Sequence, residues 1–280
     1  MKLQKAIDKA KMQQQTVSTP TGPAQAVTPP PVVKPEDNGQ PPVYTDSAAV
    51  TINEALVTEN RCVCFSPDAP ELDFYKVLRT QILHRSKEKG WNTIMVTSTL
   101  PGEGKTLTSI NLALTFAKAY GQTVLLVDCD LRQQKIHSYL GLESDSGIAD
   151  YLMNGRPLKD LILWPKVDKL TLISGGQTII ESAELLGSKR MKEMVAEMKS
   201  RYGDRYVIFD TPPLLSGADA LVFSQLVDGI VIVVEEGRTP IKEVQKALDL
   251  IPKEKFLGFV LNKASITQKG YYGYYRQDVK

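Results

Sequence analysis

The 280-residue chain has few cysteines, little net charge and no long apolar run. Its three cysteines, Cys62, Cys64 and Cys129, are odd in number and lack a zinc-site spacing, so we expect neither a disulfide framework nor a structural zinc. The formal net charge of +2 gives none of the strong positive field typical of proteins that bind nucleic acid. No stretch approaches the roughly 18 apolar residues that a membrane span needs, and no signal peptide is evident. These absences predict a cytoplasmic protein that binds no nucleic acid, and any membrane role would come through a partner or a surface contact.

The N-terminal part differs in composition from the rest of the chain. Residues 1–16 place Leu3, Ile7 and Ala10 at helical spacing among lysines, which predicts a short amphipathic helix. A helix of this length suits either a solvated terminus or a surface contact. Residues 17–50 contain eight of the seventeen prolines and predict a disordered proline-rich linker.

The C-terminal residues 266–280 are unusually rich in tyrosine. Four of the eleven tyrosines lie here, separated by Gly273 and preceded by Gly270. The segment has neither a helical nor a strand period, so we expect a flexible tail. Its four phenols are those of Tyr271, Tyr272, Tyr274 and Tyr275.

Residues 51–265 alternate between short β-rich runs and longer helical patterns. Such alternation predicts an α/β domain with a doubly wound, mostly parallel sheet and helices on both faces, in which ligands bind at the carboxyl ends of strands. The predicted strands are 93–97, 124–127, 170–174, 206–210, 230–234 and 256–261.

A glycine-rich segment follows the first of these strands and precedes a helical pattern. It ends in Gly104-Lys105-Thr106, the end of a Walker A motif, although Thr99 replaces the usual first glycine. In such a P-loop, backbone N–H groups bind phosphates, the lysine reaches the β- and γ-phosphates and the hydroxyl holds Mg²⁺. We therefore expect ATP and Mg²⁺ to bind at Pro101, Gly102, Glu103, Gly104, Lys105, Thr106 and Leu107.

Acidic residues follow two further apolar strands. Asp128 and Asp130 come after the strand at 124–127, and Asp210 ends the strand at 206–210. Because carboxyl ends of parallel strands meet at one edge of a sheet, we expect these acids near the phosphate loop, where they would bind Mg²⁺ or move protons.

Together, the motifs TSTLPGEGKT, VLLVDCDLR and VIFDTPP resemble the Walker A, A′ and B motifs of the bacterial tyrosine kinases of the CpsD/CapB type, called BY-kinases, which serve polysaccharide synthesis and export. The resemblance covers about residues 60–280 and extends to the segments GIADYL, AELL and VLN and to the tyrosine tail. It implies a P-loop kinase that transfers the γ-phosphoryl group of ATP to tyrosine, in itself and in other proteins.

The resemblance also implies roles for individual residues. Lys105, Asp128, Asp130 and Asp210 would be catalytic, with Asp128 steering or accepting the tyrosine proton. Thr106 and the same three aspartates would hold Mg²⁺. Arg132 would contact phosphate or a neighbouring subunit, and Asn262 would contact adenine. The phosphate acceptors would be Tyr271, Tyr272, Tyr274 and Tyr275.

The same resemblance implies partners for the protein. The family implies a homo-oligomer, a transmembrane polysaccharide co-polymerase that activates the kinase and recruits it to the inner face of the membrane, and a cognate tyrosine phosphatase.

Two other functions stay open: an ATPase switch of the MinD/ParA type and a nucleotide-binding scaffold of the polysaccharide machinery. The switch proteins carry a signature lysine early in the loop, where this chain has Leu100.

Overall fold

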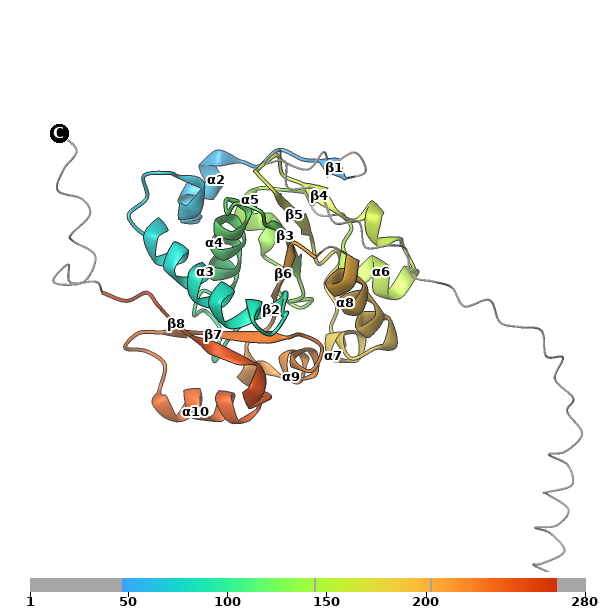
Figure 1. The fold of residues 1–280 in the computed structure, drawn as a ribbon. Helices are drawn as coiled ribbons and strands as arrows, with labels where there is room; N and C mark the ends of the chain where they lie inside the picture. The colour runs from blue at the N-terminus through green and yellow to red at the C-terminus, as the bar shows by residue number, and fades with distance from the viewer. Residues whose placement is uncertain (1–46, 144, 202, 266–280) are drawn as a thin grey trace, which may run out of the picture. The chain divides into compact units, whose positions relative to one another are not determined.

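The computed structural model describes residues 47–143, 145–201 and 203–265 (Figure 1). The predicted helix at 1–16, most of the predicted linker and the tail with its four candidate acceptor tyrosines lie outside these residues. Ala48–Ala49 form strand β1 and pair with strand β4, although they were predicted to lie in the linker. The sheet therefore includes residues that precede the predicted boundary at residue 51.

One sheet of eight strands forms the centre of the described part, in the order β1-β4-β5-β3-β6-β2-β7-β8. Neighbouring strands are parallel except β4 and β5, which pair antiparallel. The six strands predicted from sequence are all present to within a residue or two, and the short strands β1 and β4 were not predicted. The strands are β1 Ala48–Ala49, β2 Thr93–Ser98, β3 Thr123–Asp128, β4 Leu163–Trp164, β5 Leu170–Ile173, β6 Arg205–Asp210, β7 Gly229–Glu235 and β8 Phe256–Asn262.

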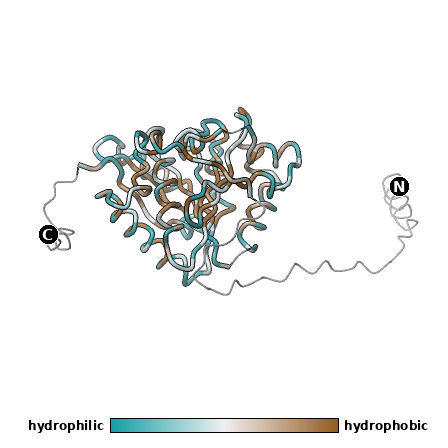
Figure 2. The backbone as a smooth tube through the Cα atoms, turned by 90° about the horizontal axis from the view of Figure 1, so that it is seen from above, coloured by the Kyte–Doolittle hydropathy of each residue, from teal (hydrophilic) through white to brown (hydrophobic). Residues whose placement is uncertain are grey.

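Helices cover both faces of this sheet and bury both. In β2, Met95 faces one apolar cluster, whereas Ile94 and Val96 face the other, as the two-residue period of a strand requires. The first cluster draws on helices α6 to α10 and the second on α2 to α5. Figure 2 shows the hydrophobic segments running through the interior of the described part. The helices are α2 Glu54–Glu59, α3 Leu72–Lys87, α4 Lys105–Ala117, α5 Ile136–Leu140, α6 Ile148–Asn154, α7 Ser182–Leu186, α8 Lys189–Arg201, α9 Asp219–Ser224 and α10 Ile241–Asp249.

The strand order brings the predicted site residues to one edge of the sheet. Strand β2, which leads into the glycine-rich loop, lies between β6 and β7, and β3 lies next to β6. In the register, Asp128 at the end of β3 is opposite Asp210 at the end of β6. The predicted fold class, a doubly wound, mostly parallel α/β sheet with helices on both faces, is confirmed.

None of the helices in the described ranges is long and apolar enough to span a membrane.

Candidate active site

The loop between β2 and α4 is shaped for binding phosphate. Gly102 and Gly104 have φ angles of +85° and +92°, which L side chains rarely adopt. Gly104 is the N-cap of α4 and supplies no side-chain cap, and the first turn of the helix contains no acidic residue. The N–H groups of that first turn have no partner inside the helix, and the helix dipole makes its N-terminus favourable for an anion.

Lys105 lies between two buried carboxylates at the start of α4. Its Nζ is 2.8 Å from Asp130 Oδ2 and 3.5 Å from Asp210 Oδ2. Burial disfavours the ammonium, but the carboxylates of Asp210 and Asp130 outweigh it and raise the pKa of Lys105 above its ordinary range. The lysine is therefore charged at neutral pH and is positioned beside the loop that would bind phosphates.

Two hydroxyl groups of α4 hold the carboxylate of Asp210. Thr106 Oγ1 donates to Asp210 Oδ2 at 2.6 Å, and Ser109 Oγ donates to Asp210 Oδ1 at 3.1 Å. Asp210 is fully buried, and this burial raises its pKa against the opposing effect of Lys105. Sequence reasoning missed Ser109, although its spacing of four residues from Lys105 puts both side chains on one face of the helix.

Asp128 binds main-chain N–H groups with both of its oxygens. Its Oδ1 accepts from the N–H of Asp130 at 3.2 Å, and its Oδ2 accepts from Lys135 and Ile136 at 3.1 Å each. Burial, together with the neighbouring Asp210, raises the pKa of Asp128 to about 7. A carboxyl group with this pKa can both take up and release a proton near neutral pH.

Glu103 and Asn262 contact the loop itself. The Glu103 carboxylate, 2% exposed, accepts from the N–H of Leu100 at 2.8 Å and from the Thr239 hydroxyl. Asn262 Nδ2 donates to the Glu103 carbonyl at 2.8 Å. Both residues were predicted to bind nucleotide. Glu103 lies within the phosphate loop and Asn262 contacts it, and their contacts with nucleotide stay predictions.

Arg132 follows Asp130 by two residues, and its side chain points to the N-termini of two helices. Its Nε donates to Ser182 Oγ at 2.9 Å, and its guanidinium is 3.3 Å from Asp219 Oδ2. These contacts connect the end of β3 to the starts of α7 and α9. Its predicted contact with phosphate or a neighbouring subunit stays a prediction.

Cys129, between Asp128 at the end of β3 and Asp130, is fully buried. Burial and the adjacent Asp128 raise the pKa of its thiol well above the ordinary value. A thiol of this kind is a poor nucleophile, so Cys129 serves as a small packing residue at the site.

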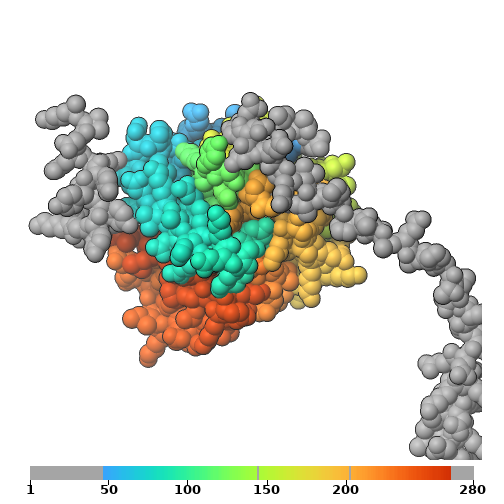
Figure 3. Space-filling model, in the orientation of Figure 1, coloured from blue at the N-terminus to red at the C-terminus, as the bar shows by residue number. Residues whose placement is uncertain are grey.

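An open groove of about 1160 Å³ adjoins the loop. It runs between α3 and the edge strand β8, and Figure 3 shows α3 beside the C-terminal elements on one face of the molecule. Its lining includes Gly102, Gly104, Leu107 and Asn262, so it is large enough and close enough to accept a nucleoside beside the phosphate loop.

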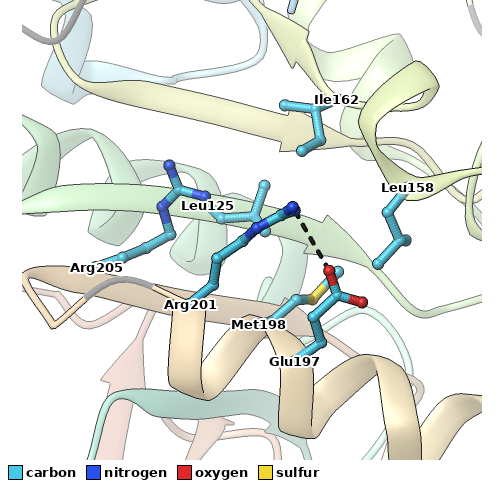
Figure 4. A pocket seen from close by; sticks show the side chains of 7 residues that line it. All are labelled: Leu125, Leu158, Ile162, Glu197, Met198, Arg201 and Arg205. Atoms are coloured by element: carbon cyan, nitrogen blue, oxygen red, sulfur yellow. Dashed lines mark ion pairs between the residues drawn. The ribbon is translucent and has the colours of Figure 1, made fainter. Parts of the chain in front are cut away.

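A second, much smaller hollow of about 20 Å³ has room for roughly one water molecule (Figure 4). Two arginines reach it, and one of them, Arg201, pairs with Glu197 at 3.3 Å. Arg205 begins β6, so this hollow lies toward the amino ends of the strands, opposite the phosphate loop. It is too small and too distant from the loop to bind the nucleotide.

A strand, a glycine-rich loop, a helix N-terminus, a buried lysine and strand-end carboxylates together define a P-loop nucleotide-binding protein. The AAA domain family model matches residues 91–255. The chain is 35% identical to the tyrosine-protein kinase YwqD of Bacillus subtilis (strain 168) over 211 residues, which cover 75% of this chain and 88% of YwqD. The chain belongs to the family of bacterial tyrosine-protein kinases.

Solved structures agree with this assignment. The kinase domain of the Escherichia coli tyrosine kinase ETK superposes with a TM-score of 0.67 at 26% identity, covering 83% of this chain and 95% of that domain. The septum site-determining protein MinD of Pyrococcus horikoshii OT3, solved with Mg-ADP, gives a TM-score of 0.51 at 22% identity over 61% of this chain and 69% of MinD. At that identity, the likeness to MinD shows the shared fold alone. The predicted family is thus confirmed.

Proposed function

We propose that the protein is an ATP-dependent tyrosine autokinase that transfers the γ-phosphoryl group of ATP to its own C-terminal tyrosines. The observation that carries the proposal is the position of Lys105, whose ammonium lies beside the phosphate loop and between Asp130 and Asp210. A fixed positive charge at this place would bind the β- and γ-phosphates and stabilise charge in the transferring group. Membership in the tyrosine kinase family supports tyrosine as the acceptor.

The donor groups beside Lys105 fit Mg²⁺. Among the described residues, no three His, Cys, Asp or Glu side chains gather around a point where they could hold a metal by themselves. Mg²⁺ bound with ATP needs fewer protein ligands, because it keeps several waters and takes oxygens from the phosphates. The Thr106 hydroxyl and the Asp210 carboxylate, already 2.6 Å apart, would supply the protein ligands, with Asp130 and Asp128 nearby. When bound, the ion would neutralise charge on the phosphates.

Asp128 is the proposed acceptor of the tyrosine proton. A phenol has an ordinary pKa of about 10, so it keeps its proton until late in the transfer and needs a nearby base. Asp128 is suited to this role because burial and Asp210 raise the pKa of its carboxyl to about 7. Asp130, which pairs directly with Lys105, would position the lysine and the metal.

The proposed acceptors are Tyr271, Tyr272, Tyr274 and Tyr275, on a tail that would enter the active site of a neighbouring copy in a homo-oligomer. Each phosphate would add about −1.5 to −2 charges at neutral pH, and repulsion between phosphates would loosen such an assembly. We further propose a transmembrane polysaccharide co-polymerase as activator and membrane recruiter, and a tyrosine phosphatase that resets the cycle. These partners rest on the family resemblance.

A complementation experiment between two full-length variants tests the proposal. The donor carries Tyr→Phe at all four tail positions and keeps an intact site, and the acceptor carries Lys105→Met and keeps the tail. The two proteins are mixed with ATP and Mg²⁺, with the activator's cytoplasmic segment included in a parallel reaction, and tail peptides are analysed by mass spectrometry. Phosphate should appear on the acceptor tail only when the donor is present.

Each variant alone serves as a control. Neither should yield a phosphorylated tail, because one lacks acceptor hydroxyls and the other lacks the phosphate-binding lysine. An acceptor tail that stays unmodified in both mixtures, while the wild-type chain is also unmodified, would contradict the autokinase proposal and favour a switch or a scaffold. Modification of the wild-type chain without transfer in the mixture would instead confine the reaction to a single molecule.

A further inference from the structure

Two side chains at the end of β8 hold main-chain carbonyls of the phosphate loop. Lys263 Nζ donates to the Gly102 carbonyl at 2.9 Å, and Asn262 Nδ2 donates to the Glu103 carbonyl at 2.8 Å. Lys263 and Gly102 are 161 residues apart in sequence. They meet because the carboxyl ends of β2 and β8 lie on the same side of the sheet. Lys263 is the residue directly after β8.

These two bonds fix the direction of the N–H groups that a phosphate loop uses. In a trans peptide the N–H points opposite to the C=O, and the described residues contain no cis peptide bond. Holding the Gly102 carbonyl toward Lys263 therefore turns the N–H of Glu103 away from β8. Holding the Glu103 carbonyl toward Asn262 does the same for the N–H of Gly104, so two consecutive donors are directed away from β8 together.

The lysine is itself held in place by a neighbouring turn. Its Nζ also lies 3.0 Å from Glu235 Oε2 at the end of β7, and Arg238 pairs with the same oxygen at 3.2 Å. The hydrogen bond from Lys263 lowers the pKa of the Glu235 carboxyl, with a smaller contribution from Arg238. The carboxylate therefore stays ionised at neutral pH and keeps the ammonium between the turn after β7 and the loop.

We propose that Lys263, together with Asn262, is a positioning residue that pre-forms the phosphate-binding loop. The two side chains hold the Gly102 and Glu103 carbonyls toward β8 and so direct the following N–H groups away from β8. The proposal rests on nucleotide binding at this loop and extends it to a residue outside the Walker motifs. It predicts that Lys263 affects the binding of phosphates in general, whether or not an adenine base is attached.

Binding measurements on the full chain test this role. Wild type, Lys263→Met and Lys263→Arg are titrated with Mg-ADP and with magnesium tripolyphosphate, which has no base, and Kd is measured by calorimetry. Lys263→Met should weaken both ligands about fivefold, because it removes one charge-assisted hydrogen bond from the loop. Lys263→Arg should restore binding of both, since the guanidinium can donate to the same carbonyl and carboxylate.

Lys255→Met is the matched control. Lys255 also donates to a main-chain carbonyl, that of Gln225 at 2.8 Å, but at the end of α9 and away from the loop. It should leave both Kd values unchanged, and thermal unfolding measured without nucleotide should show both Met variants folded at the temperature of the titrations. The proposal is overturned if Lys263→Met binds both ligands like wild type, if it weakens Mg-ADP alone, or if Lys255→Met weakens them equally. Failure of wild type to bind either ligand would instead remove the proposed function along with it.

Discussion

Replacing Gly104 with alanine tests the packing of Asn262 on the phosphate loop. A Cβ at this position would lie 2.2 Å from Asn262 Nδ2, well inside van der Waals contact, so the asparagine would have to rotate away. Its hydrogen bond to the Glu103 carbonyl would then be lost, at a cost of about 1 kcal/mol. The φ of +92° adds backbone strain of roughly 1–2 kcal/mol for an L side chain. We therefore expect Gly104→Ala to lower the free energy of unfolding by about 2–3 kcal/mol.

Gly102→Ala separates the two contributions. Gly102 has a similar φ of +85°, but no atom lies within 4 Å of the position its Cβ would take. This variant should show the strain without the steric contact, so its loss should be about 1 kcal/mol smaller than that of Gly104→Ala. Both losses are measured by urea unfolding at 25 °C, from the midpoint and the m-value.

A double-mutant cycle with Asn262→Ala completes the test. If the alanine at 104 acts by displacing Asn262, Gly104→Ala should cost about 1 kcal/mol less in the Asn262→Ala background than in wild type. A coupling energy indistinguishable from zero would refute the contact, and equal losses for Gly102→Ala and Gly104→Ala would refute it independently.

Three further predictions concern charge and burial. Burial raises the pKa of Asp228, but the hydrogen bonds from Lys199, Thr93 and Asn92 together outweigh it and hold the pKa below its ordinary value, so the carboxylate stabilises the fold above the unfolded-state pKa. Asp228→Asn should therefore lower the free energy of unfolding at pH 7, and urea unfolding should show the difference from wild type shrinking as the pH falls below about 4. Lys105→Met leaves two buried carboxylates without their cation, and it should cost about 3 kcal/mol in the same assay, partly recovered by neutralising either acid. Burial raises the pKa of Cys62 and Cys64 to about 12 and about 11, so mass spectrometry after iodoacetamide at pH 8 should find both unmodified in the folded protein and alkylated in urea.

The strands and the phosphate loop were predictable because local sequence determines them. Runs such as Thr93–Thr97 are apolar or β-branched on both faces of a buried parallel strand. The motif ending in Lys105-Thr106 is typical of a phosphate-binding loop. Asp128, Asp130 and Asp210 could be placed together because the carboxyl ends of parallel strands converge.

The residues that support the loop could not be predicted in the same way. Glu103 meets Thr239 across 136 residues of sequence, and nothing near either residue indicates that contact. Strands β1 and β4 have two residues each and depend on pairing with distant partners. Two residues are too few to show the alternating pattern of a strand in the sequence. The family resemblance implied that Arg132 contacts phosphate or a neighbouring subunit, whereas the direction of its side chain depends on Asp219 at the start of α9.

A tyrosine kinase passes the γ-phosphoryl group of ATP to tyrosine, and the destination of this group can be measured directly. Full-length protein is incubated with γ-labelled ATP and Mg²⁺, with and without the activator's cytoplasmic segment, and label in phosphotyrosine is compared with label in free phosphate. We expect label on Tyr271, Tyr272, Tyr274 or Tyr275 in wild type and none with Lys105→Met. Label that appears only as free phosphate, with every tyrosine unmodified, would contradict tyrosine phosphorylation and identify an ATPase.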